Sequence, residues 1–298
     1  METVEKDGVM QEIKWRTRTD LAVEITENLE ETELEEGVNI QVHFNCDKSI
    51  KETIIKIVNE KGERRIGKPK GTYITIEGED LSDPDESYHK EMSFIFSERL
   101  NEMLRQYNSI LIAGLGNENI TSDSLGPNVV KNLFVTRHLL KEGIIHKSKS
   151  VCALIPGVMG QTGMEAVDMI KGVVREIKPD VVVVIDALAA RNVGRLTKTI
   201  QICDTGIAPG SGVGNHRKEI SKTSIGVDVI AVGVPTVIAV PTLVMDALSI
   251  LEDAEEVANL KKYMPTELLD MYVTPKNVDE AVKKISYTIS EAFNQIVI

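Results

Sequence analysis

The 298-residue chain has only three cysteines, Cys46, Cys152 and Cys203, and they lie far apart. An odd number of isolated cysteines argues against a disulfide framework, and the absence of a CxxC pair argues against a cysteine-ligated metal site. No stretch approaches 18 uncharged apolar residues, and the first seven residues are acidic rather than basic and then apolar. We therefore expect neither a membrane span nor an export signal, and a reducing cytoplasm fits the cysteine content.

The chain also has fewer basic residues than acidic ones. Lys and Arg number 34 against 46 Asp and Glu, which gives a formal net charge of -12. Such a chain lacks the basic footprint of a protein that binds nucleic acid or anionic membranes, so basic or neutral partners are easier to accommodate. With 42% hydrophobic residues, the length suits one large domain or one domain with an appendage.

Three common catalytic or cofactor motifs are missing. The glycine-rich segment at 114–119 has Asn119 where the dinucleotide fingerprint requires its third glycine. The segment around Ser211 lacks the GxSxG spacing of a nucleophile elbow. No HExxH pair is present, so a zinc-protease helix is not expected. The remaining candidate chemistry is carried by two aspartates.

These two aspartates follow two short apolar runs of strand character. The run at 109–113 leads through glycines into a loop that contains Asp123, and the β-branched run at 181–185 ends at Asp186. Ligands of open α/β sheets bind at the carboxyl ends of the strands. If the two carboxyl groups converge there, they do not both ionise easily, so one keeps its proton while the other activates water. That arrangement suits amide hydrolysis.

A purely structural role for the same aspartates fits the residues about equally well. Asp123 would cap the helix that begins near Ser124, and Asp186 would accept backbone N–H groups in its own turn. The glycine-dense segment at 206–219 is similarly open to several interpretations. It could form backbone nests for an anion, a flap over a site or only a flexible connection. An anion-binding or small-molecule-binding module and an inactive scaffold therefore stay as alternatives to an enzyme.

The order of apolar patterns predicts an α/β fold with a mostly parallel central sheet, helices on both faces and extra N-terminal β segments. Two prolines, Pro235 and Pro241, should interrupt the strand at 227–240. The acidic run at 27–36 reads as a solvated face or flexible arm. We expect strands at 38–42, 52–58, 72–76, 109–113, 151–155, 181–185, 198–203 and 227–240, and helices at 86–107, 127–140, 164–177 and 277–296.

Several long motifs resemble the germination endopeptidase family of spore-forming bacteria, in the same order from about Arg18 to Lys276. They are GLGN at 114–117, DSLGP at 123–127, PGVMGQTG at 156–163, IDALAAR at 185–191, PGSGVGN at 209–215 and GVPT at 233–236. The resemblance implies a fold similar to the hydrogenase-maturation proteases. It also implies a homotetrameric endopeptidase that starts the degradation of the small acid-soluble proteins coating spore DNA. The location would be the cytoplasm of the forespore or the spore core, without direct binding to nucleic acid or membrane.

The same resemblance assigns roles to individual residues. Asp123 and Asp186 correspond to the two essential aspartates of the family. Cleavage of a zymogen would fall between Asp20 and Leu21, which makes residues 1–20 a propeptide and residues 21–298 a single α/β peptidase domain. An acidic residue followed by Leu-Ala and Glu is similar to the family's substrate sequences, so this arm would act as an internal substrate.

Substrate positioning is expected from three residues in the matching loops, Arg191, Ser211 and Asn215. The neighbouring His216 is not assigned a catalytic role. No histidine occurs in a pattern that would join the carboxylates on a metal, so we expect a metal-free aspartate pair and no cofactor.

Overall fold

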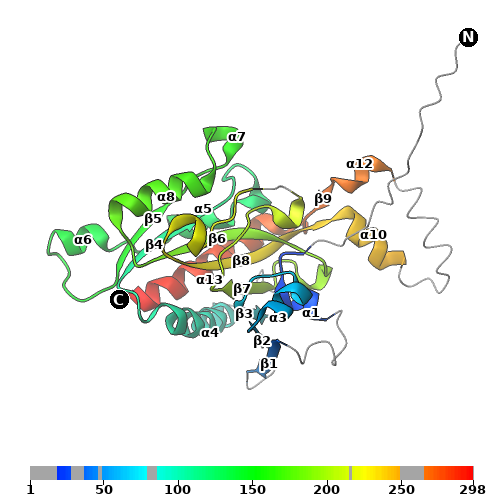
Figure 1. The fold of residues 1–298 in the computed structure, drawn as a ribbon, viewed down its shortest axis with the longest axis horizontal. Helices are drawn as coiled ribbons and strands as arrows, with labels where there is room; N and C mark the ends of the chain where they lie inside the picture. The colour runs from blue at the N-terminus through cyan, green and yellow to red at the C-terminus, as the bar shows by residue number, and fades with distance from the viewer. Residues whose placement is uncertain are drawn as a thin grey trace, which may run out of the picture.

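The computed structural model describes residues 19–27, 37–45, 49–78, 86–214, 217–248 and 265–297. Within this part of the chain a nine-stranded sheet has the order β1-β2-β3-β7-β8-β6-β4-β5, and β9 pairs with β8 (Figure 1). The strands are β1 (Val38–Phe44), β2 (Lys51–Ile57), β3 (Gly71–Glu77), β4 (Ser109–Gly114), β5 (Ser150–Leu154), β6 (Val181–Ala190), β7 (Thr199–Cys203), β8 (Asp228–Ala239) and β9 (Tyr272–Val273).

The sheet combines a parallel half and an antiparallel half. Strands β5, β4, β6 and β8 are parallel neighbours, whereas β1, β2, β3 and β7 continue the sheet through antiparallel ladders. The expected α/β fold is confirmed, and so is the expected extension of one sheet edge by N-terminal strands. The parallel half matters for the site, because its strands all end on the same edge of the sheet.

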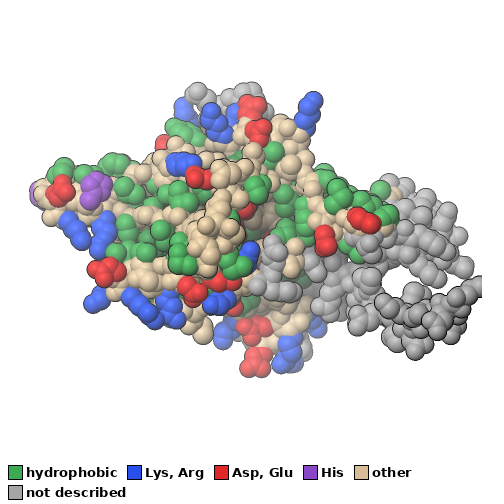
Figure 2. All heavy atoms as spheres, turned by 90° about the horizontal axis from the view of Figure 1, so that it is seen from above, with side chains coloured by type: hydrophobic (Ala, Val, Ile, Leu, Met, Phe, Trp, Pro, Cys, Tyr) green, Lys and Arg blue, Asp and Glu red, His purple; other side chains and the backbone are tan. Residues whose placement is uncertain are grey.

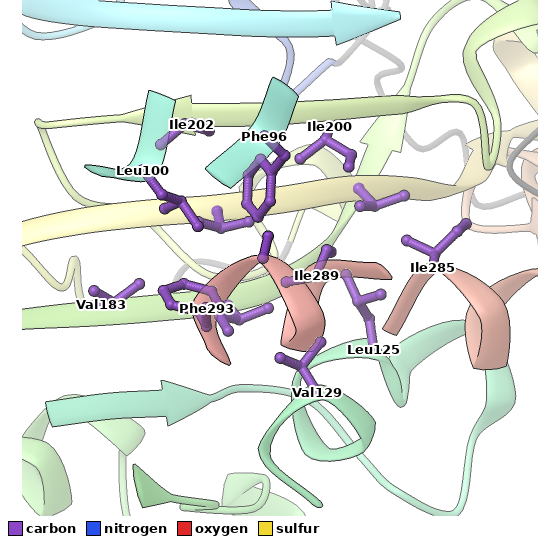
Figure 3. Packing of buried hydrophobic residues seen from close by; sticks show 14 of the residues in the cluster. Phe96, Leu100, Leu125, Val129, Val183, Ile200, Ile202, Ile285, Ile289 and Phe293 are labelled. Atoms are coloured by element: carbon purple, nitrogen blue, oxygen red, sulfur yellow. The ribbon is translucent and has the colours of Figure 1, made fainter. Parts of the chain in front are cut away.

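Helices cover both faces of the sheet. Because side chains alternate along a strand, β6 directs Val183 and Ile185 to one face and Val182 and Val184 to the other. The first face packs against α4, α5 and α13, where Phe96 and Phe293 meet edge to face at 6.3 Å between ring centroids (Figure 3). These helices are α4 (Glu86–Leu104), α5 (Leu125–Lys131) and α13 (Val278–Val297).

Four helices pack against the second face of the sheet. They are α1 (Ala22–Thr26), α3 (Glu60–Ile66), α8 (Ala166–Ile177) and α9 (Lys222–Ile225). Four shorter or peripheral helices complete the described chain, namely α6 (Arg137–Lys141), α7 (Met159–Thr162), α10 (Val240–Leu248) and α12 (Thr266–Leu269).

The helix expected at 127–140 is two helices, α5 and α6, with a break between them. The backbone N–H of Thr136 donates to the Val151 carbonyl on the edge strand β5, and the Thr136 hydroxyl accepts from the Val151 N–H at 2.9 Å. The backbone N–H of Phe134 donates to Oδ1 of Asn294 at 2.8 Å. Backbone groups that a continuous helix needs are therefore engaged elsewhere, and the single-helix prediction is wrong.

Strand β6 runs further than the sequence predicts, and the interruption expected at Pro235 of β8 is not found. Strand β6 continues past 185 because it stays paired with β8 as far as Ala190, with a register shift after Leu188. Strand β8 continues through Pro235 because β7 pairs with it only as far as Gly233, so no ladder on that side needs the missing N–H of the proline. Asp186 consequently lies within a strand rather than at its end.

The N-terminal segment is packed into the protein where it is described. Leu21, Ala22 and Val23 are buried beneath the second face of the sheet, whereas Glu27, the first residue of the acidic run, is exposed as expected. The rest of the acidic run, at 28–36, lies outside the described residues, as do positions 1–18 of the expected propeptide. No helix in the described part of the chain is long and apolar enough to cross a membrane. Figure 2 shows acidic and basic side chains interspersed over the face seen from above.

Candidate active site

A cavity of about 750 Å³ opens at the carboxyl ends of β4 and β6. Its lining includes Asp123 and Asp186, the two aspartates that the sequence predicts to converge, together with Asp20 from the N-terminal segment. The glycine-dense segment at 206–219 contributes Pro209, Gly210, Val213 and Gly214 to the same wall. Glu165 and Asp270 also line it, so five acidic residues from distant parts of the sequence share one cavity.

Asp123 reaches the cavity from the loop that follows β4. It is the last residue of a short 3-10 turn at Thr121–Asp123, and its Oδ2 accepts the backbone N–H of Asn117 at 2.9 Å. The N-cap of the following helix α5 is Ser124, so Asp123 does not cap that helix as the structural alternative predicted. Burial raises the pKa of Asp123, and the hydrogen bond from Asn117 opposes that shift.

Asp186 lies on β6 one residue beyond the end of its neighbour β4. The last pair between these strands joins Gly114 to Ile185, so Asp186 has no β4 partner beside it. Its side chain is only 5% exposed and accepts the Ala187 N–H at 3.0 Å. Burial raises the pKa of Asp186 well above its ordinary value, and the nearby charges of Asp123 and Asp20 raise it further.

Asp20, on the N-terminal side of the expected cleavage position, is held against β6 and the glycine-dense segment. Its backbone N–H donates to the Ala189 carbonyl at 3.0 Å, and its Oδ2 accepts the Ala189 N–H at 2.9 Å. The Ser211 hydroxyl donates to Oδ1 at 2.6 Å. A Cβ on Gly212 would stand 2.2 Å from the Asp20 carboxylate, so only glycine permits this close approach.

Glu24, four residues after Asp20, is a second carboxylate of the N-terminal segment that hydrogen bonds hold in place. Glu24 is 2% exposed, and its oxygens accept the backbone N–H groups of Arg191 at 2.7 Å and Asn192 at 2.8 Å. The buried guanidinium of Arg195 lies 3.6 Å from Glu24 and forms shorter ion pairs with Glu27 and Glu77. Hydrogen bonding to Arg195 also lowers the pKa of Glu27.

Of the three residues expected to position the substrate, two contact the N-terminal segment and one lies outside the described residues. Arg191 contacts the N-terminal segment through its backbone, and Ser211 does so through its hydroxyl. Asn215 and His216 lie outside the described residues. Two contacting residues were missed by the sequence analysis: Arg195, and Gln201 on β7, whose amide bonds to the backbone of the segment. Arg195 lies in no matching motif, whereas Gln201 belongs to the TIQ stretch at 199–201 that also resembles the family and is a lone polar residue in an apolar strand.

The described residues contain no group of three or more His, Cys, Asp or Glu side chains arranged to hold a metal ion. The carboxyl groups nevertheless form a definable chemical unit. A buried carboxyl and a half-buried one, both with raised pKa values, face one cavity, and hydrogen bonds hold Asp20 of the N-terminal segment at its wall. A carboxyl pair of this kind can supply both a general acid and a general base to a bound peptide bond.

Comparison with known proteins identifies the class. A family model described as germination protease matches residues 17–262. The germination protease of Clostridium acetobutylicum is 42% identical, covering 93% of this chain and 94% of that protein. The germination protease of Caldanaerobacter subterraneus subsp. tengcongensis is 41% identical, covering 93% of each. The chain is therefore a peptidase. It belongs to the germination protease family, which confirms the resemblance found in its motifs.

A comparison with solved structures gives a weaker similarity. The nickel-iron hydrogenase maturation protease HycI from Thermococcus kodakarensis matches with a TM-score of 0.34 and 19% sequence identity. The match covers 65% of this chain and 97% of that protein.

Proposed function

We propose that this peptidase is an endopeptidase made as a zymogen, and that Asp123 and Asp186 together hydrolyse the peptide bond. One observation carries the proposal: the expected cleavage position, Asp20 followed by Leu21, begins in the cavity that both aspartates line. The segment is held there by hydrogen bonds from its backbone and its side chains. The N-terminal segment is thus bound where a substrate of the two aspartates would bind.

The two aspartates take different roles because their surroundings differ. Asp186 is the more deeply buried and lies near two other carboxylates, so it keeps its proton and serves as the acid. Asp123, which a backbone N–H stabilises in its ionised form, takes a proton from water. The water oxygen bonds to the Asp20 carbonyl carbon, the bond to the Leu21 nitrogen breaks, and that nitrogen receives the proton of Asp186. The products are a free amine at Leu21 and a new carboxyl group at Asp20, which releases its proton to solvent, while the proton gained by Asp123 returns to Asp186 through solvent.

Substrates would bind as the N-terminal segment binds. An acidic residue before the cut would contact Ser211 and the Ala189 N–H, and a second one four residues later would contact the N–H groups of Arg191 and Asn192. We propose that small acid-soluble spore proteins are these substrates and that degradation begins during germination. A net charge of -12 is compatible with partners that bind DNA. The side chains of Arg191 and Asn215 are proposed to assist this binding.

Removal of residues 1–20 would separate a propeptide from a single peptidase domain at 21–298. We place the protein in the cytoplasm of the forespore or spore core as a homotetramer, without a cofactor. These proposals follow from the family.

The decisive experiment compares the wild-type chain with Asp123→Asn and Asp186→Asn. Each purified protein is incubated with a small acid-soluble spore protein, and mass spectrometry follows both chains. We expect both variants to fold and to lose self-processing as well as substrate cleavage. Asp168→Asn, an exposed change on α8, is the matched control and should cut normally. Full activity in either folded site variant would remove that aspartate from the mechanism.

A further inference from the structure

Gln201 of β7 contacts the N-terminal segment on both sides of the bond between Asp20 and Leu21. Its Nε2 donates to the Asp20 carbonyl oxygen at 3.2 Å, and its Oε1 accepts the Ala22 N–H at 2.7 Å. The Gln201 side chain is 7% exposed, so water competes little for either bond. The carbonyl that it contacts is the one that hydrolysis between Asp20 and Leu21 would attack.

The orientation of the Gln201 amide follows from its two partners. Only the oxygen of the amide can accept the N–H of Ala22, which leaves the NH₂ group for the carbonyl of Asp20. A flipped amide would set a donor against a donor and an acceptor against an acceptor. The segment therefore selects the orientation that directs an N–H group at the carbonyl oxygen.

The sheet register puts Gln201 and Asp186 on the same face of the sheet. Gly233 on β8 pairs with Gln201 on one side and with Asp186 on the other. Partners directly opposite each other across a ladder direct their side chains to the same face, and two strand spacings amount to about 10 Å. Between them the side chain of Leu188 covers Gly233. The bound segment spans this interval, because Asp20 bonds to Ala189 of β6 as well as to Gln201.

We propose that Gln201 is a catalytic residue that stabilises the oxyanion formed on the carbonyl of the bond being cut. The inference rests on the proposed function, in which that bond joins Asp20 to Leu21. As water adds to the carbonyl carbon, the electron pair of the C=O bond moves onto the oxygen, and the Nε2–H group of Gln201 lies against the resulting negative charge. The charge returns to the carbonyl when the C–N bond breaks and the leaving nitrogen takes up a proton.

The ground-state distance agrees with this role. Donors to a developing oxyanion act best at about 2.7–3.1 Å from its final position. The observed 3.2 Å bond to the neutral carbonyl can shorten as charge accumulates on the oxygen. The interaction thus strengthens in the transition state, and such an interaction raises kcat rather than substrate affinity alone.

The test removes the amide in one variant and shortens the side chain in another. Gln201→Met removes both polar atoms, and Gln201→Asn keeps an amide that is too short to reach the same carbonyl. Gln41→Met, an exposed change on β1, is the matched control. Circular dichroism and thermal unfolding check that each variant folds. The rate of self-processing is measured on the full-length chain. The kcat and KM of the processed enzyme are measured on a peptide with the sequence of residues 16–24.

We expect Gln201→Met and Gln201→Asn to lower kcat by about 10²–10³-fold with KM changed less than about threefold, as for other single oxyanion donors. The control should match wild type. An unchanged kcat in either folded variant, or a rise in KM alone, would overturn the catalytic role and leave a binding role. If wild type itself cuts elsewhere than after Asp20, the proposed function fails. If wild type cuts there and both Gln201 variants cut as fast, only the inference about Gln201 fails.

Discussion

The carboxylate of Asp20 raises the pKa of Asp186, although the two residues lie far apart in the sequence. They line one cavity, and Asp186 is buried on β6 one residue beyond the last pair of that strand with β4. A segment that enters this cavity therefore brings with it a charge that helps Asp186 to hold its proton. Binding of an acidic peptide and the protonation of the acid are coupled in this arrangement.

Asp186→Asn should stabilise the protein at neutral and alkaline pH while it abolishes activity. A carboxyl whose pKa is raised by folding stabilises the native state fully below its unfolded pKa, and this contribution is lost as the pH rises through its folded pKa. The variant should therefore gain more than about 1 kcal/mol at pH 8, since a pKa that differs by one between the folded and unfolded states corresponds to about 1.4 kcal/mol. Thermal unfolding of the variant and of wild type from pH 4 to pH 8 measures this gain in stability. A gain that does not shrink toward acid pH would contradict the assignment.

Glu24→Gln should slow self-processing by about 10- to 100-fold, because hydrogen bonds to a charged group contribute about 1.5–3 kcal/mol. The new NH₂ group would face the N–H of Arg191 or Asn192 instead of accepting from it. Conversion of the precursor is followed by mass spectrometry. Glu118→Gln, which alters an exposed carboxylate paired with Lys131, is the control. A conversion rate equal to wild type would mean that Glu24 does not help to hold the segment in place.

Ser211→Ala should slow cleavage after Asp20 by about tenfold through loss of the 2.6 Å hydrogen bond to its carboxylate. A double-mutant cycle with Asp20→Asn separates this contact from other effects of either change. We expect the two changes together to cost clearly less than the sum of the single changes. Strict additivity of the two losses, measured as self-processing rates, would show that Ser211 acts independently of Asp20.

The main course of the fold could be predicted from local patterns. Runs such as 181–185 are apolar in every position, which is typical of a strand buried on both faces. The terminal helix at 277–296 follows from apolar residues at helical spacing, and the structure has it at Val278–Val297. The two aspartates could be picked out because each follows an apolar strand, and parallel strands end together. In each case the information lies within a few residues of the feature.

Predictions failed where a distant partner decided the local structure. The break between α5 and α6 depends on Thr136 bonding to β5, and the extension of β6 depends on its ladder with β8. The burial of Leu21, for which the sequence makes no prediction, depends on a hydrophobic surface built by other strands. Periodicity carries no record of such contacts, because it reports which side of an element is apolar and not what will cover it.

The sequence by itself determined the α/β order of the chain, the family to which it belongs and the two acidic residues to examine. Only the tertiary structure decided that Asp20 shares one cavity with those two acids, and that Glu24 and Gln201 hold the segment on either side of it by hydrogen bonds. The physical reason is that hydrogen bonds and charge effects depend on distances of a few ångströms. These distances are set by the pairing of strands that lie far apart in the chain, so no local pattern contains them.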